Sequence, residues 1–278
     1  MKFAKAHGLG NDFILVGSEH VPRAAAPWAQ RLCDRHLGIG GDGVLAFAVE
    51  GDLVRMRLLN ADGSDGDVSG NGARCLAAYA VGKGWLAARH VVQTPVGPRA
   101  VEVEALGSGR SRVVTDLGPA ILASSEIPVS LDPPREPVVG YTLQVSGRSV
   151  AVTATSLGNP HCALFLEAAA EDALLESLGP VLERHPFFPR RTNVEFVTVL
   201  ARDRLRVRFW ERGVGYTRAS GTGAASAVVA AVLNGLADRR VSVQCDGGTL
   251  DVEWPEAGSV RQTGEVEVLF EGDWQIAP

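Results

Sequence analysis

Ser69-Gly70-Asn71-Gly72-Ala73-Arg74-Cys75 (SGNGARC) and 220–226 (SGTGAAS) share the pattern S-G-[NT]-G-A, 151 positions apart. Each copy opens a run that is rich in alanine and valine and poor in charge, LAAYAV in the first and SAVVAAVL in the second. A helix that is apolar around most of its circumference is buried. A glycine, Gly84 or Gly235, follows fifteen positions after each serine and predicts the helix stop. The two copies therefore predict two buried helices that begin in the same way.

The duplication extends upstream of both copies. Asn60 and Glu211 each stand nine positions before the serine of their copy, and each closes a strand-like run. The stretches GLGNDF and SLGNPHC form another matching pair, in which Asn11 and Asn159 are 148 positions apart. These matches predict two structurally similar halves.

The rest of the pattern predicts an α+β chain in which strands predominate. Many segments alternate or run apolar over four to seven residues, as in VRMRLLN, RLRVRFWE and EVEVLFEG, which is typical of strands. We predict an N-terminal lobe over 1–118, completed by a C-terminal strand at about 265–278, and a C-terminal lobe over 119–264. Helical periodicity is confined to four segments, 27–36, 71–83, 169–184 and 222–237.

Composition excludes several classes of protein. The 278 residues are 46% hydrophobic and 21% charged, which suits a chain with a large core, and the net charge is −5 without a long basic run, so we expect no nucleic-acid partner. No segment reaches the roughly 18 apolar residues of a membrane span, and MKFAKAHGLGNDF lacks a signal-peptide core. The four cysteines have no CxxC spacing, which predicts neither disulfides nor zinc and indicates a reducing cytoplasm.

A glycine-rich turn that enters a helix leaves the first backbone N–H groups without helical partners. Together with the positive end of the helix dipole, these donors form an anion site. Two such starts could converge on one carboxylate or phosphate. Serine is also a favoured N-cap residue, so Ser69 and Ser220 have a structural interpretation that is compatible with anion binding.

The chain resembles the diaminopimelate epimerase family over essentially its full length. The resemblance rests on eight blocks in the family's order: KAHGLGNDFILV (5–16), CDRHLGIGGDG (33–43), NADGSDGDVSGNGARC (60–75), SLGNPHC (156–162), RRTNVEF (190–196), WERGVG (210–215), SGTGA (220–224) and TGEVEVLFEG (263–272). It implies an α+β fold of two pseudo-symmetric diaminopimelate-epimerase-like lobes, each a central helix wrapped by mostly antiparallel strands.

The resemblance also implies an activity. Members interconvert LL- and meso-diaminopimelate, for lysine and peptidoglycan precursors, without PLP, metal or any other cofactor. One base removes the α-proton of the amino-acid substrate, and an acid on the opposite face returns a proton with inverted configuration. The substrate α-carboxylate lies between the two helix N-termini, where fixed backbone dipoles stabilise carbanion charge. The family further implies a homodimer.

Site residues follow from the matching motif positions. Arg212 is the expected partner of a distal carboxylate, because its guanidinium binds one bidentately, and Glu211 is expected to pair with an ammonium group. His161 is expected to tune the protonation of a catalytic residue. The resemblance assigns catalysis to Ser69, Ser220, His161 and Glu211, and substrate binding to Asn11, Asn60, Gly70, Asn71, Asn159, Asn193, Glu211, Arg212, Gly221 and Thr222.

The chain departs from the family at the catalytic positions. Both glycine loops of the family follow a cysteine, whereas this chain has Ser69 and Ser220. A thiol has a pKa of about 8.5, which helix N-termini lower further, while a hydroxyl needs a neighbouring base. Cys75 matches a later, non-catalytic cysteine. Tyr216 stands where the family usually has glutamate, and Gly43 where some members have a glutamine that contacts the substrate.

Three interpretations of these departures remain open at the level of sequence. The chain could be a divergent diaminopimelate epimerase with serine in both roles. It could instead catalyse another reaction on this scaffold, as a one-base isomerase or a dehydratase, which Tyr216 and Gly43 would suit. Or it could be a non-catalytic binder or an engineered cysteine-to-serine form.

Overall fold

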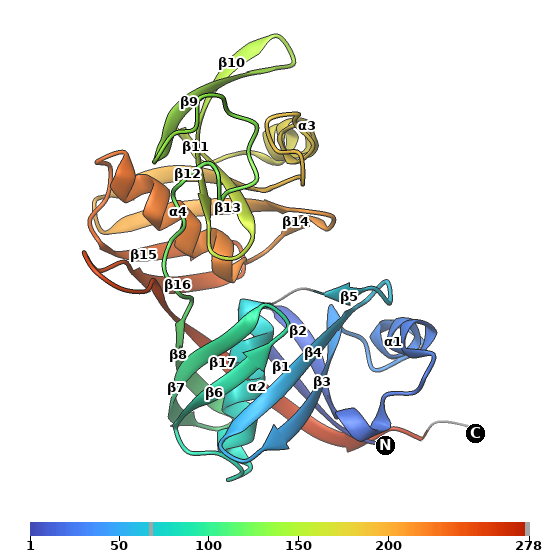
Figure 1. Ribbon diagram of the computed structural model, residues 1–278. Helices are drawn as coiled ribbons and strands as arrows, with labels where there is room; N and C mark the ends of the chain where they lie inside the picture. Colours follow the sequence, from blue (N-terminus) through green and yellow to red (C-terminus); the bar gives the residue numbers. More distant parts are fainter. Residues whose placement is uncertain (67–68, 276–278) are drawn as a thin grey trace. The chain divides into compact units, whose positions relative to one another are not determined.

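The computed structural model describes residues 1–66 and 69–275 (Figure 1). Residues 67–68 of the 60–75 motif and 276–278 of the predicted last strand lie outside the described residues. The chain divides into two compact units, which we call the N-terminal unit (Met1–Asp116 with Thr263–Pro278) and the C-terminal unit (Leu117–Gln262). Each unit is described by itself.

In the N-terminal unit a ring of strands surrounds the helix α2 (Figure 1). The strand β17 pairs with both β1 and β8 and so closes the ring. Ten of the thirteen residues of α2 are buried, as its apolar sequence predicts. The elements are β1 (Lys2–Gly8), β2 (Asn11–Gly17), η1 (Ser18–His20), α1 (Ala25–Cys33), β3 (Gly43–Glu50), β4 (Leu53–Asn60), β5 (Asp65–Gly66), α2 (Gly70–Gly82), β6 (Arg89–Thr94), β7 (Gly97–Gly107), β8 (Arg110–Asp116) and β17 (Arg261–Asp273).

The C-terminal unit is built in the same way around the helix α4, of which ten residues are also buried. Its second helix, α3, packs on β12 and β13. The elements are β9 (Val138–Val145), β10 (Arg148–Ser156), β11 (Pro160–Leu166), α3 (Asp172–Glu183), β12 (Asn193–Ala201), β13 (Arg204–Glu211), β14 (Gly215–Thr217), α4 (Gly221–Leu233), β15 (Arg240–Cys245) and β16 (Gly248–Glu253).

The two units repeat one sequence of strand pairings. In the N-terminal unit β1–β2 is antiparallel, β2–β3 parallel, β3–β4 antiparallel, β4–β6 parallel and β6–β7 antiparallel. The series from β10 to β16 in the C-terminal unit has the same alternation. The predicted fold of two pseudo-symmetric lobes, each a central helix wrapped by mostly antiparallel strands, is confirmed.

Both central helices also stop in the same way. Gly84 and Gly235 each have φ of +71°, in the left-handed region where a side chain is disfavoured. The N–H of each glycine bonds back to a helix carbonyl, at 2.9 Å to Val81 and 3.0 Å to Val232. The predicted glycine stops are therefore confirmed.

The repeated pairing gives each residue of one unit an equivalent in the other. Phe13 pairs with Gly43 across β2 and β3, and His161 pairs with Asn193 across β11 and β12. Two residues further along, Leu15 pairs with Leu45 in the first unit, whereas Ala163 pairs with Glu195 in the second. At these four positions the first unit has no polar side chain, whereas the second has three, His161, Asn193 and Glu195.

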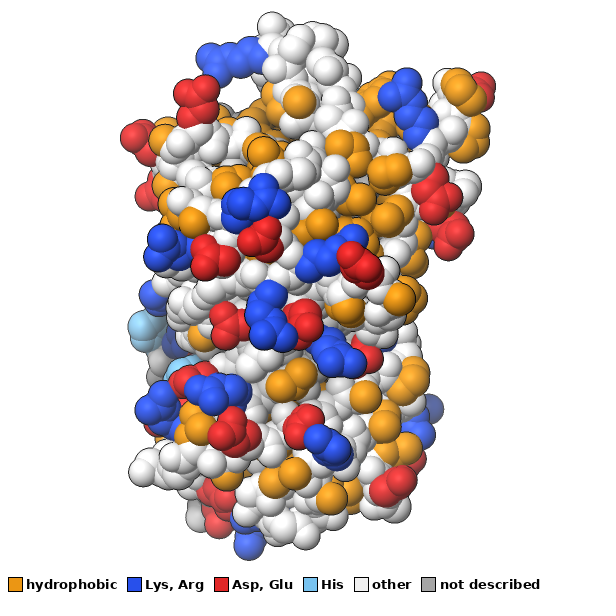
Figure 2. Space-filling model, turned by 90° about the vertical axis from the view of Figure 1, so that its left-hand side faces the viewer, with side chains coloured by type: hydrophobic (Ala, Val, Ile, Leu, Met, Phe, Trp, Pro, Cys, Tyr) orange, Lys and Arg blue, Asp and Glu red, His pale blue; other side chains and the backbone are white. Residues whose placement is uncertain are grey.

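The surface carries interspersed charge. On the face shown in Figure 2, Lys and Arg side chains lie among Asp and Glu side chains. Ion pairs such as Arg89–Glu102 (3.0 Å) and Arg55–Glu50 (2.9 Å) join neighbouring strands or strand ends. Pairs as exposed as these contribute little to stability.

A buried ion cluster holds the start of β2 in the N-terminal unit. The Asp12 carboxylate lies 2.6 Å from the Lys5 ammonium and accepts two hydrogen bonds from Arg35, at 2.6 and 3.1 Å. Burial raises the pKa of Asp12, but the hydrogen bonds and charges of Arg35 and Lys5 outweigh it and lower that pKa to about 2. Because Asp12 follows Asn11, this cluster fixes the backbone next to a predicted site residue.

We predict that Asp12→Asn destabilises the N-terminal unit by roughly 2 kcal/mol at pH 7, because a shift of one pKa unit corresponds to about 1.4 kcal/mol. The Asp12 carboxylate stabilises the fold above its unfolded pKa of about 4, and this contribution disappears as the pH falls through about 2. Urea unfolding at pH 7, 5 and 3.5 measures it. The difference in free energy of unfolding between wild type and Asp12→Asn should become smaller as the pH falls. The exposed control Asp52→Asn should differ little from wild type at any of these pH values. A difference for Asp12→Asn that stays constant with pH would contradict the assignment.

Candidate functional site

The two helix starts have nearly identical geometry. Ser69 caps α2 with φ −123° and ψ 118°, and Ser220 caps α4 with φ −127° and ψ 127°. Each serine Oγ accepts a hydrogen bond from the backbone N–H three residues on, at 3.0 Å from Gly72 and 3.2 Å from Gly223. The serine cap therefore uses the third N–H of each helix.

The N–H groups of the first two residues precede the first helical hydrogen bond. They belong to Gly70 and Asn71 in α2 and to Gly221 and Thr222 in α4. Because neither turn carries an acidic residue, the helix dipole and these donors favour an added anion at each start.

In the N-terminal unit a chain of amides leads to the start of α2. The Asn11 side chain donates to Asp42 Oδ2 at 2.7 Å and accepts from Asn71 Nδ2 at 3.2 Å. Arg74, which is fully buried, donates to Asn71 Oδ1. The structure therefore brings Asn11 and Asn71 together and fixes the orientation of both amides.

Asn60 lies at the end of β4, beside the turn that precedes α2. Its Nδ2 donates to Ser64 Oγ at 2.9 Å, and its backbone N–H donates to the Ser64 carbonyl at 2.9 Å. The side chain is partly exposed, so Asn60 retains hydrogen-bonding capacity towards solvent.

In the C-terminal unit a corresponding chain contains titratable groups. His161 is fully buried; its Nδ1 lies 2.7 Å from Glu195 Oε1, and its Nε2 lies 3.0 Å from Asn159 Oδ1. Asn159 Nδ2 in turn donates to Thr222 Oγ1 at 3.3 Å, on the first turn of α4. Burial raises the pKa of Glu195, and the charge and hydrogen bond of His161 oppose that rise.

Glu211 is the titratable group beside Ser220. Burial raises the pKa of Glu211, while side-chain interaction with the Ser220 hydroxyl and the charge of His161 lower it. Both ring nitrogens of His161 are engaged by Glu195 and Asn159. Within this unit the structure therefore pairs the Ser220 hydroxyl with Glu211 and not with His161. A carboxylate with a raised pKa beside a hydroxyl is the arrangement that general-base catalysis requires.

Asn193 and Arg212 are held together at the ends of β12 and β13. The Asn193 side chain donates to the Pro160 carbonyl at 2.9 Å and accepts from the Arg212 backbone N–H at 3.0 Å. Asn193 is buried, so its amide fixes the backbone that carries Glu211 and Arg212. The Arg212 side chain is partly exposed, and its Nη1 lies 3.4 Å from the Arg190 carbonyl.

Tyr216 points away from Glu211. It pairs with Trp210 across β13 and β14, whereas Glu211 pairs with Gly215, so the two side chains lie on opposite faces. The Tyr216 hydroxyl donates to Asp246 at 2.9 Å, and its ring lies 5.3 Å from the Arg208 guanidinium. The tyrosine therefore belongs to an ion network behind the sheet.

Gly43 has no room for a side chain on this backbone. A Cβ added there would lie 2.9 Å from the Leu59 carbonyl oxygen and 3.1 Å from Leu58. The backbone at this position has thus adapted to glycine.

The cysteines do not compensate for the serines. All four are buried, and none forms a disulfide. Burial raises the pKa of Cys75 to about 12 and that of Cys33 to about 11, so both remain thiols near neutral pH. Cys75 lies in α2 within the apolar core, where it packs as a small hydrophobic residue.

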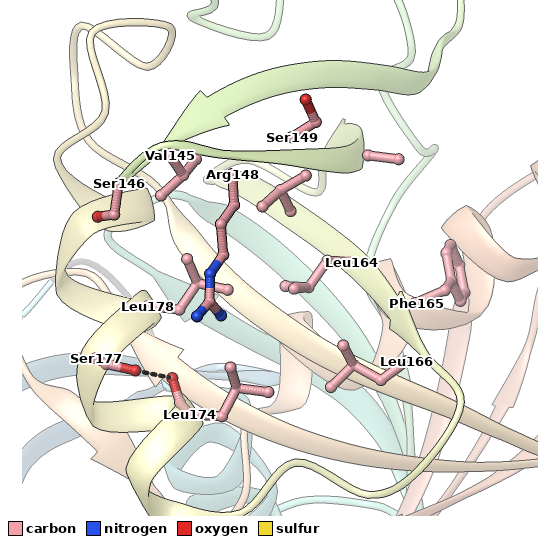
Figure 3. A pocket seen from close by; sticks show the side chains of 12 residues that line it. Val145, Ser146, Arg148, Ser149, Leu164, Phe165, Leu166, Leu174, Ser177 and Leu178 are labelled. Atoms are coloured by element: carbon pink, nitrogen blue, oxygen red, sulfur yellow. Dashed lines mark hydrogen bonds between the residues drawn. The ribbon is translucent and has the colours of Figure 1, made fainter.

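A separate cavity of about 490 Å³ lies between the hairpin β9–β10, the strand β11 and the helix α3 (Figure 3). Its walls include Leu164, Leu174 and Leu178, and the Arg148 side chain extends along them. Ser177 donates to carbonyls of its own helix at 2.7 and 3.2 Å. None of the predicted site residues lines this cavity.

Over 1–66 and 69–275, no cluster of three or more His, Cys, Asp or Glu side chains is arranged to hold a metal ion. No helix in the described part of the chain is long and apolar enough to cross a membrane.

The fold is that of a class that includes epimerases and racemases. A predicted epimerase from Pseudomonas aeruginosa superposes with a TM-score of 0.73 at 17% identity, covering 99% of both chains. A probable proline racemase from Agrobacterium radiobacter K84 superposes with a TM-score of 0.71 at 14% identity, covering 100% of this chain and 93% of that one. At these identities the likeness concerns the fold.

Sequence comparison is more specific. The model of the family described as diaminopimelate epimerase matches residues 3–123 and 153–269. Diaminopimelate epimerases of Desulforudis audaxviator and Pelotomaculum thermopropionicum are 46% and 45% identical to this chain, over 99% of it and 99% of each relative. The chain belongs to the diaminopimelate epimerase family, which confirms the resemblance and places it among isomerases.

Sequence reasoning missed two carboxylates. Asp42 bonds Asn11, and Glu195 bonds His161. Both stand inside quoted motifs, CDRHLGIGGDG and RRTNVEF. Glu195 follows Asn193 by two positions, so the period of a strand puts both on one face; Asp42 carries no comparable signal, because it lies in a loop.

We predict that Ser69→Ala and Ser220→Ala each lower the free energy of unfolding by about 1 kcal/mol, because each removes an N-cap acceptor. Ser220→Ala should lower the free energy of unfolding more than Ser69→Ala, because Ser220 is buried and Ser69 is partly exposed. The Gly223 N–H, which loses its acceptor in Ser220→Ala, therefore has less access to water. Urea denaturation measures the loss. Ser130→Ala, at an exposed loop serine, is the matched control, and losses equal to the control would show that the caps contribute nothing.

Proposed function

We propose that the chain is a cofactor-independent amino-acid epimerase that interconverts LL- and meso-diaminopimelate. The observation that carries the proposal is the matched pair of helix starts, Ser69 on α2 and Ser220 on α4, in a member of this family. In the proposed reaction the two helix starts bind the substrate α-carboxylate through the N–H groups of Gly70, Asn71, Gly221 and Thr222. As the C–H bond breaks, its electron pair moves onto this carboxylate, where fixed dipoles stabilise the charge.

Glu211 supplies the base strength that a serine lacks. In one direction, Glu211 accepts the proton of the Ser220 hydroxyl while Ser220 Oγ takes the substrate α-proton. The Ser69 hydroxyl gives a proton to the opposite face of the α-carbon, which inverts its configuration. The Ser69 alkoxide then recovers a proton from water, and Glu211 releases its proton to water. In the reverse direction each proton retraces this path. The desolvation of Glu211 supports this role, because it raises the pKa of this carboxyl above its ordinary value and so makes the carboxylate a stronger base.

The remaining predicted residues would bind the substrate. Arg212 would bind its distal carboxylate, on a backbone that Asn193 fixes. Asn11, Asn60, Asn71 and Asn159 would bind its remaining polar groups. His161 would tune the charge near Glu211, whose pKa it lowers.

One observation favours a second candidate, a one-base isomerase or dehydratase on this fold. The C-terminal unit places Glu211 beside its serine, whereas the equivalent position of the N-terminal unit carries Asn60. If Ser69 lacks a base, only one face of the substrate exchanges protons. The departures at Tyr216 and Gly43 give no further support, because Tyr216 faces Asp246 and the backbone at Gly43 excludes a side chain.

The cellular setting also belongs to the proposal. We propose a cytoplasmic, homodimeric enzyme that supplies meso-diaminopimelate for lysine and peptidoglycan synthesis, as the family resemblance implies. An apolar pair on β17, Leu269 and Phe270, is 46% and 52% exposed, and the Phe270 ring packs edge-on against Phe3. This pair offers an apolar contact for a second copy of the chain.

The proposal is tested with LL-diaminopimelate in deuterated water. We expect deuterium at one α-carbon together with formation of meso-diaminopimelate, because the returned proton comes from a solvent-exchanged hydroxyl. Mass spectrometry and NMR monitor both. Glu211→Gln should slow the exchange at least tenfold, since an amide is not a base. Exchange without inversion would select the one-base isomerase. Binding without exchange would show a non-catalytic binder and reject the proposal.

We predict that the double variant Ser69→Cys and Ser220→Cys epimerises faster than wild type. A thiol is the stronger acid, and a helix N-terminus stabilises its thiolate. The rate of meso-diaminopimelate formation measures the gain, with Ser130→Cys as the control for an added thiol. An unchanged or lower rate would mean that the site is built for the hydroxyl and its glutamate. The double variant should also become sensitive to thiol oxidants, to which the serines are inert.

A further inference from the structure

The repeated fold supplies an internal comparison for the buried carboxylate of Glu195. Glu195 stands on β12, paired with Ala163 of β11, where the N-terminal unit has Leu45 paired with Leu15. Glu195 is 1% exposed and Leu45 is 0% exposed. The same backbone position is therefore filled by a leucine in one unit and an acid in the other, so the fold itself does not require the acid.

Burying this acid is unfavourable. A carboxylate in a protein interior loses its hydration and must be compensated by a partner. Oε1 has one in His161, but Oε2 is buried and has no hydrogen-bond partner among the described residues. Replacing both members of a buried ion pair by apolar side chains is often neutral or stabilising, so the pair of Glu195 and His161 is not needed for stability. The N-terminal unit has Leu45 at the equivalent position, so the energetically unfavourable burial of Glu195 points to a functional role.

The hydrogen bonds of Glu195 lead to the start of α4. Glu195 Oε1 accepts from His161 Nδ1, and His161 Nε2 donates to Asn159 Oδ1, which requires a ring protonated on both nitrogens. The Asn159 amide then directs its Nδ2 to Thr222 on the first turn of the helix. Three elements, β12, β11 and α4, are thus joined by one polar chain that begins at the buried carboxylate.

We propose that Glu195 is a positioning residue: it holds a proton on His161 Nδ1, and through His161 it sets the direction of the Asn159 amide at the start of α4. The inference deepens the proposed function, on which its kinetic part rests. Among the described residues, the side-chain partner of Glu195 is His161. Its effect on the reaction passes through the imidazole, as the hydrogen-bond partner of a ring nitrogen fixes the tautomer of the other.

Without the carboxylate, His161 loses the acceptor that fixes the orientation of its ring. Its Nε2 is then no longer held against Asn159 Oδ1, and the Asn159 amide is free to rotate away from Thr222. The charged groups that face His161 are Glu195 from β12 and Glu211 from the end of β13. Loss of Glu195 therefore also changes the charge balance at Glu211.

The test uses Glu195→Leu, which copies the residue of the sister unit, and Glu195→Gln, which keeps the shape and removes the charge. Glu253→Gln, at an exposed ion pair with Arg240 (3.3 Å) in the same unit, is the matched control. The full-length variants are labelled with ¹⁵N, and His161 is assigned by comparison with His161→Gln. Long-range ¹H–¹⁵N spectra from pH 5 to 9 report which ring nitrogen holds the proton.

We expect wild type and Glu253→Gln to keep the Nδ1 proton over this pH range. In Glu195→Leu the ring should lose the Nδ1 proton and keep the proton on Nε2 alone, and the melting temperature should fall, because His161 stays buried without its partner. With LL-diaminopimelate, both Glu195 variants should lose about 10- to 100-fold in kcat/KM, the size expected for a hydrogen bond to a charged group. Part of the loss should appear as a higher KM, because Asn159 binds substrate in the proposal.

Two results would overturn the inference. One is an unchanged His161 spectrum in both Glu195 variants, which would show that the carboxylate does not hold the ring. The other is a kcat/KM within twofold of wild type despite a changed spectrum, which would show that positioning His161 does not matter for the reaction. A wild-type protein that fails to epimerise would reject the proposed function instead, and the nitrogen spectra would still decide the positioning.

Discussion

The first N–H groups of each central helix have no partner within the helix, so the surrounding structure must supply one. A helix as apolar as α2 or α4 must be buried, and burial of its first turn leaves polar donors that need an acceptor. Ser69 and Ser220 satisfy one donor each. The remaining donors favour an anion at each helix start, and the side chains of Asn71 and Thr222 there are bonded to Asn11 and Asn159.

The fold repeats this arrangement twice, but the chemistry is not symmetric. Around α2 the polar chain consists of amides, Asn11 and Asn71, with Asp42 at its outer end. Around α4 it contains His161 and Glu195. Backbone symmetry provides two equivalent donor sites, while the side chains make one of them titratable.

Serine stands at both positions where the family has cysteine, so a neighbouring side chain must supply the base that a thiol would not need. A thiol can ionise at a helix start without help, whereas a hydroxyl needs a base in contact. Glu211 provides this contact for Ser220, and its burial raises its pKa in the direction that suits the role. The remaining cysteines do not take over, because burial keeps Cys75 and Cys33 in the thiol form.

The sequence by itself determined the architecture, since apolar helices with a shared S-G-x-G-A start and strand periodicities are local patterns, and equal spacings revealed the repeat. It also indicated which residues to examine, through the motifs. Only the tertiary structure decided their partners. It paired Glu211 with Ser220, turned Tyr216 towards Asp246, and placed Glu195 where the sister unit has Leu45. The physical reason is that hydrogen-bond partners and burial depend on strand register and side-chain direction across segments distant in sequence, which local patterns do not encode.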